Sequence, residues 1–322
     1  MKIFLTGSAG FVGSHLVPYL QELGHEVICN FRQNEKSMAR LQEQKSACFD
    51  LSNKDLLRNE LDGVDAVIHC AAFVYPWGSK NDFDQNNIVA TKNLIDIAKQ
   101  SGVSRFIYLS CASVVMDERN ALFNISESSP YTNQSCMPYS KSKAVAEQYV
   151  LTAGDALLKT IALRPAFIWG RGDMIDRQIG QAAKQGKFGW FDQGNYLFST
   201  CYIDNLNVAI AKALHTDISG EAFFISDGKP IIFRDFMTQR LTIDQFPIPT
   251  LSMSRRFAWA LAKFTENGWK YLPMKGSPPI TREMVRLTGY PFTISINKAL
   301  EILGYQPKYT IAEAMAQLNR VS

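Results

Sequence analysis

Tyr139 and Lys143 are the two residues of this sequence whose types and spacing are best suited to proton transfer. They stand four positions apart in a helix predicted over 139–151, so both side chains project from one helix face. A free tyrosine has a pKa of about 10 and is a poor base at neutral pH, but a neighbouring ammonium favours the phenolate. A tyrosine tuned in this way can give or take a proton at a carbonyl or alcohol oxygen. The pair alone is a weak signal, because a solvated helix face often carries the same two residues.

A nucleotide-binding loop that could position this pair is predicted at the start of the chain, MKIFLTGSAGFVG. An apolar run at 3–5 leads into Gly7, Gly10 and Gly13, and an apolar helical pattern follows, which indicates strand, tight turn and helix. Such a turn lets backbone N–H groups approach a pyrophosphate, and the helix dipole favours its charge. The spacing is G-x-x-G-x-x-G, and three glycines by themselves also suit an ordinary strand-to-helix turn.

Arg32 favours NADP over NAD as the cofactor. A strand is predicted over 25–30, and the chain continues Phe31-Arg32 at the point where an NAD-binding chain usually places a carboxylate. No Asp or Glu is available there, and an arginine can bind a ribose 2′-phosphate through several donors. The alternative is that Arg32 is simply a solvated loop charge.

Alternating strands and helices indicate the fold class. Strands are predicted over 47–51, 66–72, 105–109 and 160–163, and helices over 11–23, 38–44, 54–61, 83–101 and 139–151. This alternation predicts an α/β protein with a Rossmann-type doubly wound parallel sheet. Ser110, Cys111 and Ser113 then lie at the carboxyl end of the 105–109 strand, where ligands of such sheets bind.

The pattern changes after Gly170. We expect a dinucleotide-binding domain over 1–168 and a smaller, mostly helical substrate-binding part over 169–322, with the chain returning to the first domain around 200–215. Helices are predicted over 174–186 and 204–214, extended chain over 197–203 and a strand over 222–226. Residues 251–272 mix aromatic and basic side chains. This stretch suits a membrane surface or a partly buried lid helix over a hydrophobic substrate, and we favour the lid.

Composition excludes several classes of protein. Of the 322 residues 46% are hydrophobic, enough for a large core, and a net charge of +4 gives no case for nucleic-acid binding. No signal peptide or transmembrane run is recognisable, so a cytoplasmic protein is expected. The six cysteines form no C-x-x-C pair and are expected to be reduced and mostly buried. The four histidines show no ligand spacing, so no metal is expected, and His69 is interpreted as a core residue.

Taken together, the motifs resemble the extended short-chain dehydrogenase/reductase superfamily, of the NAD-dependent epimerase/dehydratase type. The matching segments span nearly the whole chain: 6–13, 50–51, 69–72, Asn87, 108–114, 139–143, 163–165, 169–173, 202–206 and 303–307. The segments YLSCASVV and LGYQP look nearest to the branch of 3β-hydroxysteroid dehydrogenases and dihydroflavonol reductases.

The resemblance implies roles for the catalytic residues and for the residues that bind the cofactor. Tyr139 is the proton donor or acceptor, and Lys143 binds the nicotinamide ribose and lowers the tyrosine's pKa. The glycines hold the pyrophosphate, Asp50 and Leu51 meet the adenine, two alanines line the nucleotide cleft, and Pro165 and Ile168 lie near the nicotinamide. With Arg32, the cofactor-binding residues are then Gly7, Gly10, Phe11, Val12, Gly13, Asp50, Leu51, Ala71, Ala72, Lys143, Pro165 and Ile168.

Cys111 departs from the pattern of the superfamily, which has Ser or Thr as the hydroxyl that orients the substrate. A thiol is a weak hydrogen-bond donor, so Ser110 or Ser113 is a candidate to replace it. Strand alternation would point both serines away from the direction of Cys111 if the extended geometry continued. We favour a local bend that lets a neighbour take over; a weakly effective thiol or an altered chemistry are the alternatives. No histidine is near in sequence to activate Cys111 as a nucleophile.

These observations favour an NAD(P)-dependent oxidoreductase that transfers hydride between a nicotinamide cofactor and a ketone or secondary alcohol of a hydrophobic small molecule. One alternative is a nucleotide-sugar epimerase or dehydratase with tightly bound NAD, and another is a non-catalytic NADP(H)-binding sensor. The substrate pocket is expected from the variable loops 73–85, 114–136, 186–200 and 251–280. The helices over 83–101 and 139–151 could form a homodimer interface by analogy.

Overall fold

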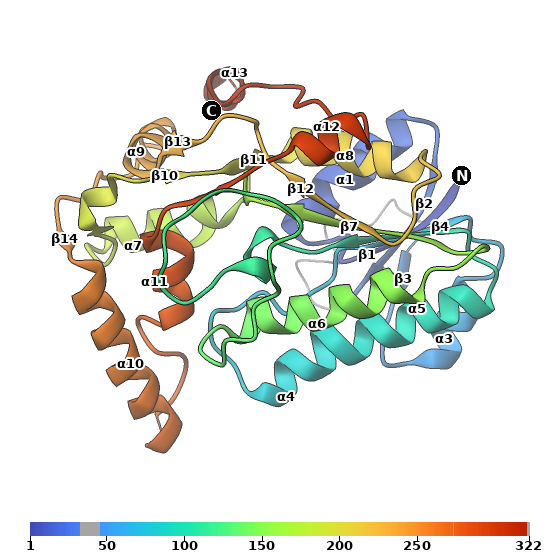
Figure 1. Ribbon diagram of the computed structural model, residues 1–322, viewed down its shortest axis with the longest axis horizontal. Coiled ribbons are helices and arrows are strands. Elements are labelled where there is room, and N and C mark those ends of the chain that lie inside the picture. Colours follow the sequence, from blue (N-terminus) through green and yellow to red (C-terminus); the bar gives the residue numbers. More distant parts are fainter. Residues whose placement is uncertain (33–45, 273, 321–322) are drawn as a thin grey trace.

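A seven-stranded parallel sheet is the centre of the molecule, in the order β12-β7-β5-β4-β1-β2-β3 (Figure 1). The computed structural model describes residues 1–32, 46–272 and 274–320, so the helix expected over 38–44 lies outside the described residues. The strands are β1 (Lys2–Thr6), β2 (Glu26–Phe31), β3 (Ser46–Cys48), β4 (Ala66–His69), β5 (Arg105–Leu109), β7 (Lys159–Pro165) and β12 (Glu221–Ile225). The chain adds strands outward from β1 on one side and then on the other, which confirms the doubly wound Rossmann-type prediction.

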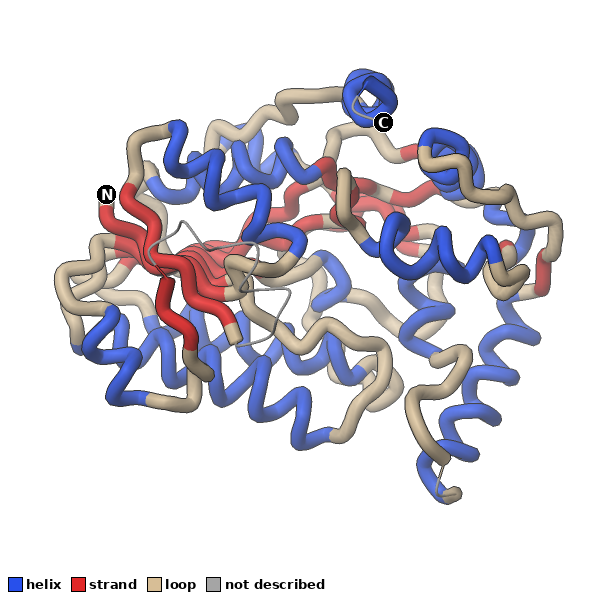
Figure 2. The backbone as a smooth tube through the Cα atoms, turned by 180° about the vertical axis from the view of Figure 1, so that it is seen from behind, coloured by secondary structure: helices blue, strands red, loops and turns tan. Residues whose placement is uncertain are grey.

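Helices cover both faces of this sheet (Figure 2). On one face α1 (Phe11–Glu22) packs against α8 (Ile203–Leu214), and the other face carries α3 (Lys54–Glu60), α5 (Ala90–Gln100) and α6 (Pro138–Ala153). Because side chains alternate along a strand, β1 sends Ile3 and Leu5 into the core on one face and Phe4 into the core on the other. Strands that are buried on both faces are expected of a parallel sheet.

A second, smaller part holds short strands and helices beyond one end of the large sheet (Figure 1). Its four-stranded sheet has the order β13 (Ile231–Ile232), β10 (Leu197–Phe198), β15 (Phe292–Ile294) and β6 (Leu122–Ile125), and the two-stranded pairs are β8 (Phe167–Trp169) with β11 (Thr200–Tyr202) and β9 (Trp190–Phe191) with β14 (Ser252–Met253). Its helices are α7 (Gly180–Lys184), α9 (Phe233–Ile243), α10 (Arg255–Tyr271), α11 (Arg282–Gly289) and α13 (Ile311–Arg320). The short helix α12 (Asn297–Glu301) packs against β12 of the large sheet. The chain passes between the parts more than once, since β6 comes from the N-terminal half while α8 and β12 join the large sheet.

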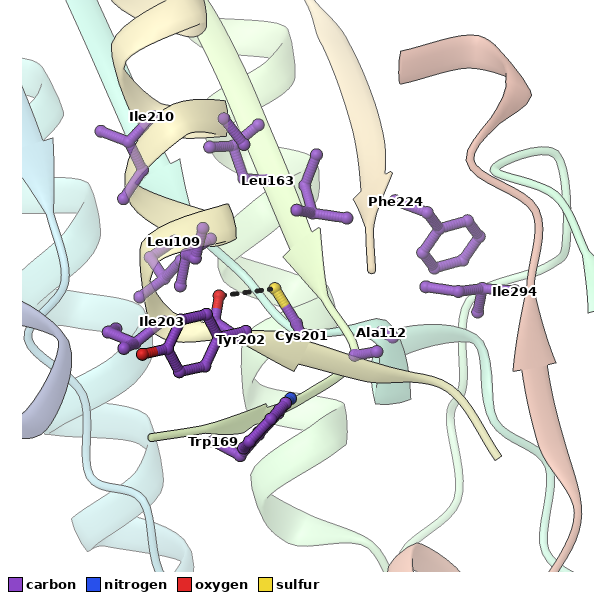
Figure 3. Packing of buried hydrophobic residues seen from close by; sticks show 14 of the residues in the cluster. Leu109, Ala112, Leu163, Trp169, Cys201, Tyr202, Ile203, Ile210, Phe224 and Ile294 are labelled. Atoms are coloured by element: carbon purple, nitrogen blue, oxygen red, sulfur yellow. Dashed lines mark hydrogen bonds between the residues drawn. The ribbon is translucent and has the colours of Figure 1, made fainter. Parts of the chain in front are cut away.

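The two parts share a continuous core near Trp169 (Figure 3). Leu109 and Leu163 of the sheet lie beside Ile203 and Ile210 of α8 in that view. The buried Trp169 indole donates to a carboxylate oxygen of Asp227 at 2.8 Å, and Asp227 also accepts from Thr200, Tyr202 and Asn205. A carboxylate with that many donors is satisfied inside the protein, so it holds the two parts together without an unpaired buried charge.

Four predicted elements differ in detail. The strand expected over 47–51 is β3, which ends at Cys48. The helix expected over 83–101 begins earlier, as α4 (Lys80–Phe83), because Ser79 and Asp82 form a capping box; a π-helical stretch at Asp84–Val89 then leads into α5. The helix expected over 174–186 begins with a π-helical stretch at Ile175–Ile179 before α7. The strand expected over 66–72 ends at His69, and the residues after it turn toward the glycine loop.

His69 is a fully buried core residue, as predicted, with its ring between hydroxyls of Thr6 at 2.6 Å and Thr91 at 2.9 Å. Burial lowers its pKa to about 3, so it stays neutral at physiological pH. All six cysteines are free thiols, and among them Cys48 alone is exposed. Within the described ranges, no group of three His, Cys, Asp or Glu residues is placed to hold a metal, and no helix is long and apolar enough to cross a bilayer.

Candidate active site

The glycine loop between β1 and α1 is packed so closely that side chains are excluded at two positions. A Cβ added at Gly7, whose φ is +70°, would lie 2.8 Å from the backbone nitrogen of Ala71. A Cβ added at Gly13 would lie 2.4 Å from the carbonyl oxygen of Gly7. Contacts this short with backbone atoms cannot be relieved by a side-chain rotation. The start of α1 therefore lies directly against the loop, as a pyrophosphate-binding turn requires.

The neighbouring strand ends carry the residues expected to select the cofactor. Arg32 follows β2, is exposed, and donates to the Asn86 side-chain oxygen at 3.0 Å. Asp50 follows β3, is exposed, and accepts from the backbone of Ser52, while Leu51 is buried. Both charged side chains therefore lie at the carboxyl edge of the sheet, on the side of β1 where an adenosine ribose is bound in this fold.

The other cofactor-site candidates lie at the same edge of the sheet. Phe11 and Val12 open α1 and are partly exposed. Ala71 and Ala72 follow β4 and are also partly exposed, which leaves backbone accessible beside the glycine loop. Pro165 ends β7, and Ile168 pairs with Cys201 in the short β8–β11 pair.

Lys143 is buried in the first turns of α6, with a side chain only 2% exposed. Its ammonium donates to the carbonyl oxygen of Leu109 at 2.6 Å and lies 4.0 Å from the centre of the Tyr108 ring. Burial lowers the pKa of Lys143 to about 8, partly offset by Cys111 and Cys70. The lysine therefore lies at the carboxyl ends of β4 and β5, next to the loop that contacts Gly7.

Tyr139 lies on the same face of α6, with its hydroxyl in hydrogen-bonding contact with the Cys111 thiol. Burial raises the tyrosine's pKa well above its usual value, and the nearby Cys111, Tyr108 and Glu283 act in the same direction. Burial outweighs the lowering expected from Lys143, whose ammonium donates to the Leu109 carbonyl. In this arrangement Tyr139 is a neutral phenol, able to donate a proton.

The chain bends directly after Cys111, as the favoured interpretation requires. Residues Ala112–Val115 form a 3₁₀ turn, so strand alternation does not continue past Cys111. The turn brings the Ser113 hydroxyl to 3.1 Å from the Cys111 sulfur and to 2.9 Å from the Ser140 hydroxyl. The Ser110 hydroxyl is buried without a hydrogen-bond partner among the described residues. The local geometry thus places Ser113, rather than Ser110, beside the thiol.

Glu283 is a residue of this site that sequence analysis missed. It is fully buried in α11 and accepts hydrogen bonds from the backbone of Tyr139 at 3.1 Å, the backbone of Ser140 at 2.9 Å and the Ser140 hydroxyl at 2.7 Å. A carboxylate at a helix N-terminus satisfies free N–H groups and interacts favourably with the helix dipole. No local signal reveals it, because its partners are more than 140 positions earlier in the chain.

Burial raises the pKa of Glu283 to about 7, against its ordinary value of 4.5. Between pH 4.5 and pH 7 the folded protein keeps Glu283 protonated, whereas the same group is ionised in the unfolded chain. The contribution of Glu283 to the free energy of unfolding is therefore lost as the pH rises through 7. We expect the difference in free energy of unfolding between wild type and Glu283→Gln to fall by roughly 2–3 kcal/mol from pH 5 to pH 8. Urea titrations at both pH values measure it, with Glu301→Gln, at an exposed carboxylate, as the control. A difference that is constant with pH would contradict the expectation.

An open pocket of about 940 Å³ lies between residues 73–80 and the segment around the C-terminal end of α10. It is lined by aromatic side chains and two lysines, namely Phe73, Tyr75, Trp77, Lys80 and Lys270, with Gly78, Ser79, Gly276 and Ser277. Its wall is tied to α6, because the Asn87 amide bonds both to the Phe73 backbone at 2.7 Å and to the Ser142 hydroxyl at 2.8 Å. Two of the loops expected to form the substrate pocket, 73–85 and 251–280, supply all of these residues.

The doubly wound sheet, the glycine loop and the pair of a partly buried Tyr139 with a buried Lys143 define the class of protein as an extended short-chain dehydrogenase/reductase. Residues 4–249 match the model of the 3-beta hydroxysteroid dehydrogenase/isomerase family, and the chain belongs to this family. It is an NAD(P)-dependent oxidoreductase of the extended type.

Similar proteins agree with this assignment. The chain is 32% identical to a 2-alkyl-3-oxoalkanoate reductase of Stenotrophomonas maltophilia, over 100% of this chain and 99% of the relative. It is 30% identical to a 3-beta-hydroxysteroid dehydrogenase of Mycolicibacterium neoaurum, over 98% of this chain and 90% of the relative. Among solved structures, a UDP-glucose 4-epimerase of Thermotoga maritima superposes with a TM-score of 0.76 over 99% of this chain and 98% of that chain, at 22% identity. At that identity the likeness shows the fold alone.

Proposed function

We propose that this protein reduces the ketone of a hydrophobic small molecule to a secondary alcohol, with a nicotinamide cofactor bound over the glycine loop. The observation that carries the proposal is the placement of Tyr139 and Lys143. Both lie at the carboxyl ends of β4 and β5, beside the backbone that contacts Gly7. The phenol is protonated in this place and therefore has a proton to give to a carbonyl oxygen that gains negative charge.

The cofactor is supported by the fit of the loop to a pyrophosphate, since Gly7 and Gly13 leave no room for a Cβ and Ala71 and Ala72 remain accessible. When bound, it supplies the hydride for the carbonyl carbon. Residues 1–168 are proposed to hold it, and residues 169–322 to supply most of the substrate contacts. NADP is favoured over NAD because Arg32, and no carboxylate, follows β2.

The residues of the chain then have distinct roles in the reduction. Tyr139 donates its hydroxyl proton to the carbonyl oxygen as that oxygen gains negative charge. The Lys143 ammonium stabilises the phenolate left behind and binds the nicotinamide ribose. Ser113, through Cys111, is proposed to orient the substrate oxygen, because the 3₁₀ turn brings its hydroxyl to 3.1 Å from the thiol. A hydroxyl in this network compensates for the weak donor strength of the thiol.

The proposed substrate carries an acidic group on an apolar chain. The pocket walls are aromatic, and Lys270 offers a cation at its rim. One of the similar proteins is a 2-alkyl-3-oxoalkanoate reductase, whose name describes a ketone of this kind. Lys80, the second lysine of the pocket, pairs with Asp84, so Lys270 is the cation available to a carboxylate. Such a wall suits an oxo acid better than a neutral sterol, since Lys270 would otherwise face an uncharged surface.

The test is oxidation of NADPH by purified protein with two substrates, a 2-alkyl-3-oxoalkanoate and a 3-oxosteroid. We expect ketone-dependent oxidation, faster with the oxo acid, and slower turnover with NADH. No oxidation with either ketone, while fluorescence shows NADPH bound, would reject the proposal.

The nucleotide-sugar alternative predicts a different result. Such a protein would purify with oxidised nicotinamide and convert a UDP-sugar without added cofactor. The residues after β2 speak against it, because a chain that retains NAD usually has a carboxylate where Arg32 stands. A homodimer through α5 and α6, which pack side by side, also stays a proposal, and the mass in solution tests it.

A further inference from the structure

The outer face of α10 carries two parallel stripes with a seven-residue repeat. The aromatic stripe is Phe257, Phe264 and Tyr271, which are 61%, 77% and 72% exposed, and each follows an exposed basic residue, Arg256, Lys263 and Lys270. Residues seven positions apart stay nearly on one side of an α-helix, with a drift of about 20° per repeat. An aromatic stripe therefore runs beside a basic stripe along the whole length of the helix.

The inner face of α10 explains why these residues are exposed. Ala258, Trp259 and Ala262 are buried, and the helix packs against α11. The one acidic residue of α10, Glu266, is also buried, where it accepts from the backbone and guanidinium of Arg282 at 2.6 Å. The exposed face is therefore aromatic and basic, with no acidic side chain, on a helix that projects from the edge of the molecule (Figures 1 and 2).

A lid over the substrate, the interpretation favoured from the sequence, does not account for this face. A lid would bury its aromatic residues against the pocket, but Phe257 and Phe264 are exposed and are not among the residues that line it. Only the last turn of the helix reaches the pocket, through Lys270. The aromatic stripe thus requires another explanation.

We propose that the outer face of α10 docks on a membrane surface containing anionic lipid, with the helix lying in the plane of the interface. Phe and Tyr side chains would enter the boundary between headgroups and acyl chains, and Arg and Lys would reach the anionic headgroups. Exposed Leu272 and Met274 extend the apolar surface beyond the end of the helix. In the part of the chain that the structure describes no helix can span a bilayer, so attachment by an interfacial helix is the form of contact that fits.

A second copy of this chain is a poorer occupant of the same surface. Two copies joined through this face would bring two basic stripes together, with no acidic residue of α10 exposed to pair with them. Like charges placed together at an interface are strongly unfavourable. An anionic bilayer instead complements the basic stripe and takes up the aromatic stripe.

Docking would let the substrate enter the pocket from the bilayer. This consequence rests on the proposed function. The open pocket lies at the C-terminal end of α10, since Lys270 lines it together with Tyr75 and Trp77. A hydrophobic ketone dissolved in the bilayer would then reach the pocket without crossing bulk water.

Co-sedimentation with vesicles tests the docking without relying on activity. We expect the protein to bind phosphatidylcholine–phosphatidylglycerol vesicles, to bind pure phosphatidylcholine vesicles more weakly, and to release as salt is raised. Phe257→Ser/Phe264→Ser and Arg256→Glu/Lys263→Glu should each weaken binding by about tenfold or more. The matched controls are Leu157→Ser, at an apolar residue 83% exposed elsewhere, and Lys229→Glu, at an exposed lysine elsewhere.

The remaining outcomes separate the explanations. Unchanged circular dichroism, melting temperature and turnover of a water-soluble ketone would show that the variants fold, so that lost vesicle binding reports on the surface. No sedimentation of the wild type, or equal loss in the controls, would overturn the proposal. So would a wild-type oligomer that the aromatic variant converts to a monomer, because a second copy would then cover the face. Vesicle binding by a protein without ketone-reducing activity would leave the docking standing and reject the enzymatic proposal alone.

Discussion

Tyr139→Phe is expected to lower kcat for ketone reduction by about 10²–10⁴-fold, the usual contribution of a positioned proton donor. The substitution removes only the hydroxyl, which contacts the Cys111 thiol in the structure. The ring can therefore keep its place on α6. Binding of NADPH should change little, because the glycine loop and Lys143 are untouched. The measurement is steady-state turnover beside NADPH affinity by fluorescence titration.

A matched variant of the same helix makes this result specific. Tyr149→Phe removes a hydroxyl that bonds to Asp96 at 2.7 Å on the exposed side of α6, and it should keep nearly full activity. If both variants retained turnover, Tyr139 would not be the proton donor. If the wild type bound NADPH but showed no turnover with any ketone, the sensor alternative would be favoured instead.

Gly13→Ala is expected to abolish NADPH binding and to destabilise the fold by about 1–3 kcal/mol, the usual range for an overpacked site. The added Cβ would lie 2.4 Å from the Gly7 carbonyl oxygen and 2.5 Å from the Ser8 Cα. Both are backbone atoms, so the loop itself must move, and the N–H groups that would hold a pyrophosphate move with it. Fluorescence titration and thermal unfolding measure the two effects.

Gly268→Ala is the control for this change. Among the described residues its Cβ would meet only the Met274 sulfur, at 3.9 Å, which is an ordinary contact. Alanine is also favoured over glycine inside a helix such as α10. We expect equal or greater stability and unchanged NADPH affinity. Normal NADPH affinity in Gly13→Ala would show that the cofactor does not lie over the first turn.

The periodicity of the sequence predicted the large sheet well, because its strands are short apolar runs separated by amphipathic helices. Six of the seven strands are buried on both faces, β3 at the edge being the exception, so these runs need no long-range information to be recognised. The second part was harder to predict, because its strands have only two to four residues and pair with segments far away, as β6 does with β15. Such short strands are stable only where the rest of the fold holds them.

The site shows the same division. The glycine loop, Tyr139 and Lys143 are local patterns, and each could be identified from a few neighbouring residues. The direction of the Lys143 ammonium and the pKa of Tyr139 could not, because both depend on burial against β5. Nor could the position of Ser113 beside Cys111, which depends on a 3₁₀ turn.

Adjacent or regularly spaced residues are enough to predict the class of fold, the loop that can hold a dinucleotide and the pair of residues that can move a proton. Tertiary contacts alone place Glu283 beneath the start of α6 and leave the aromatic side chains of α10 facing outward. Burial and long-range contacts set the charge and direction of a side chain. Neither quantity is a property of the residue's neighbours in sequence.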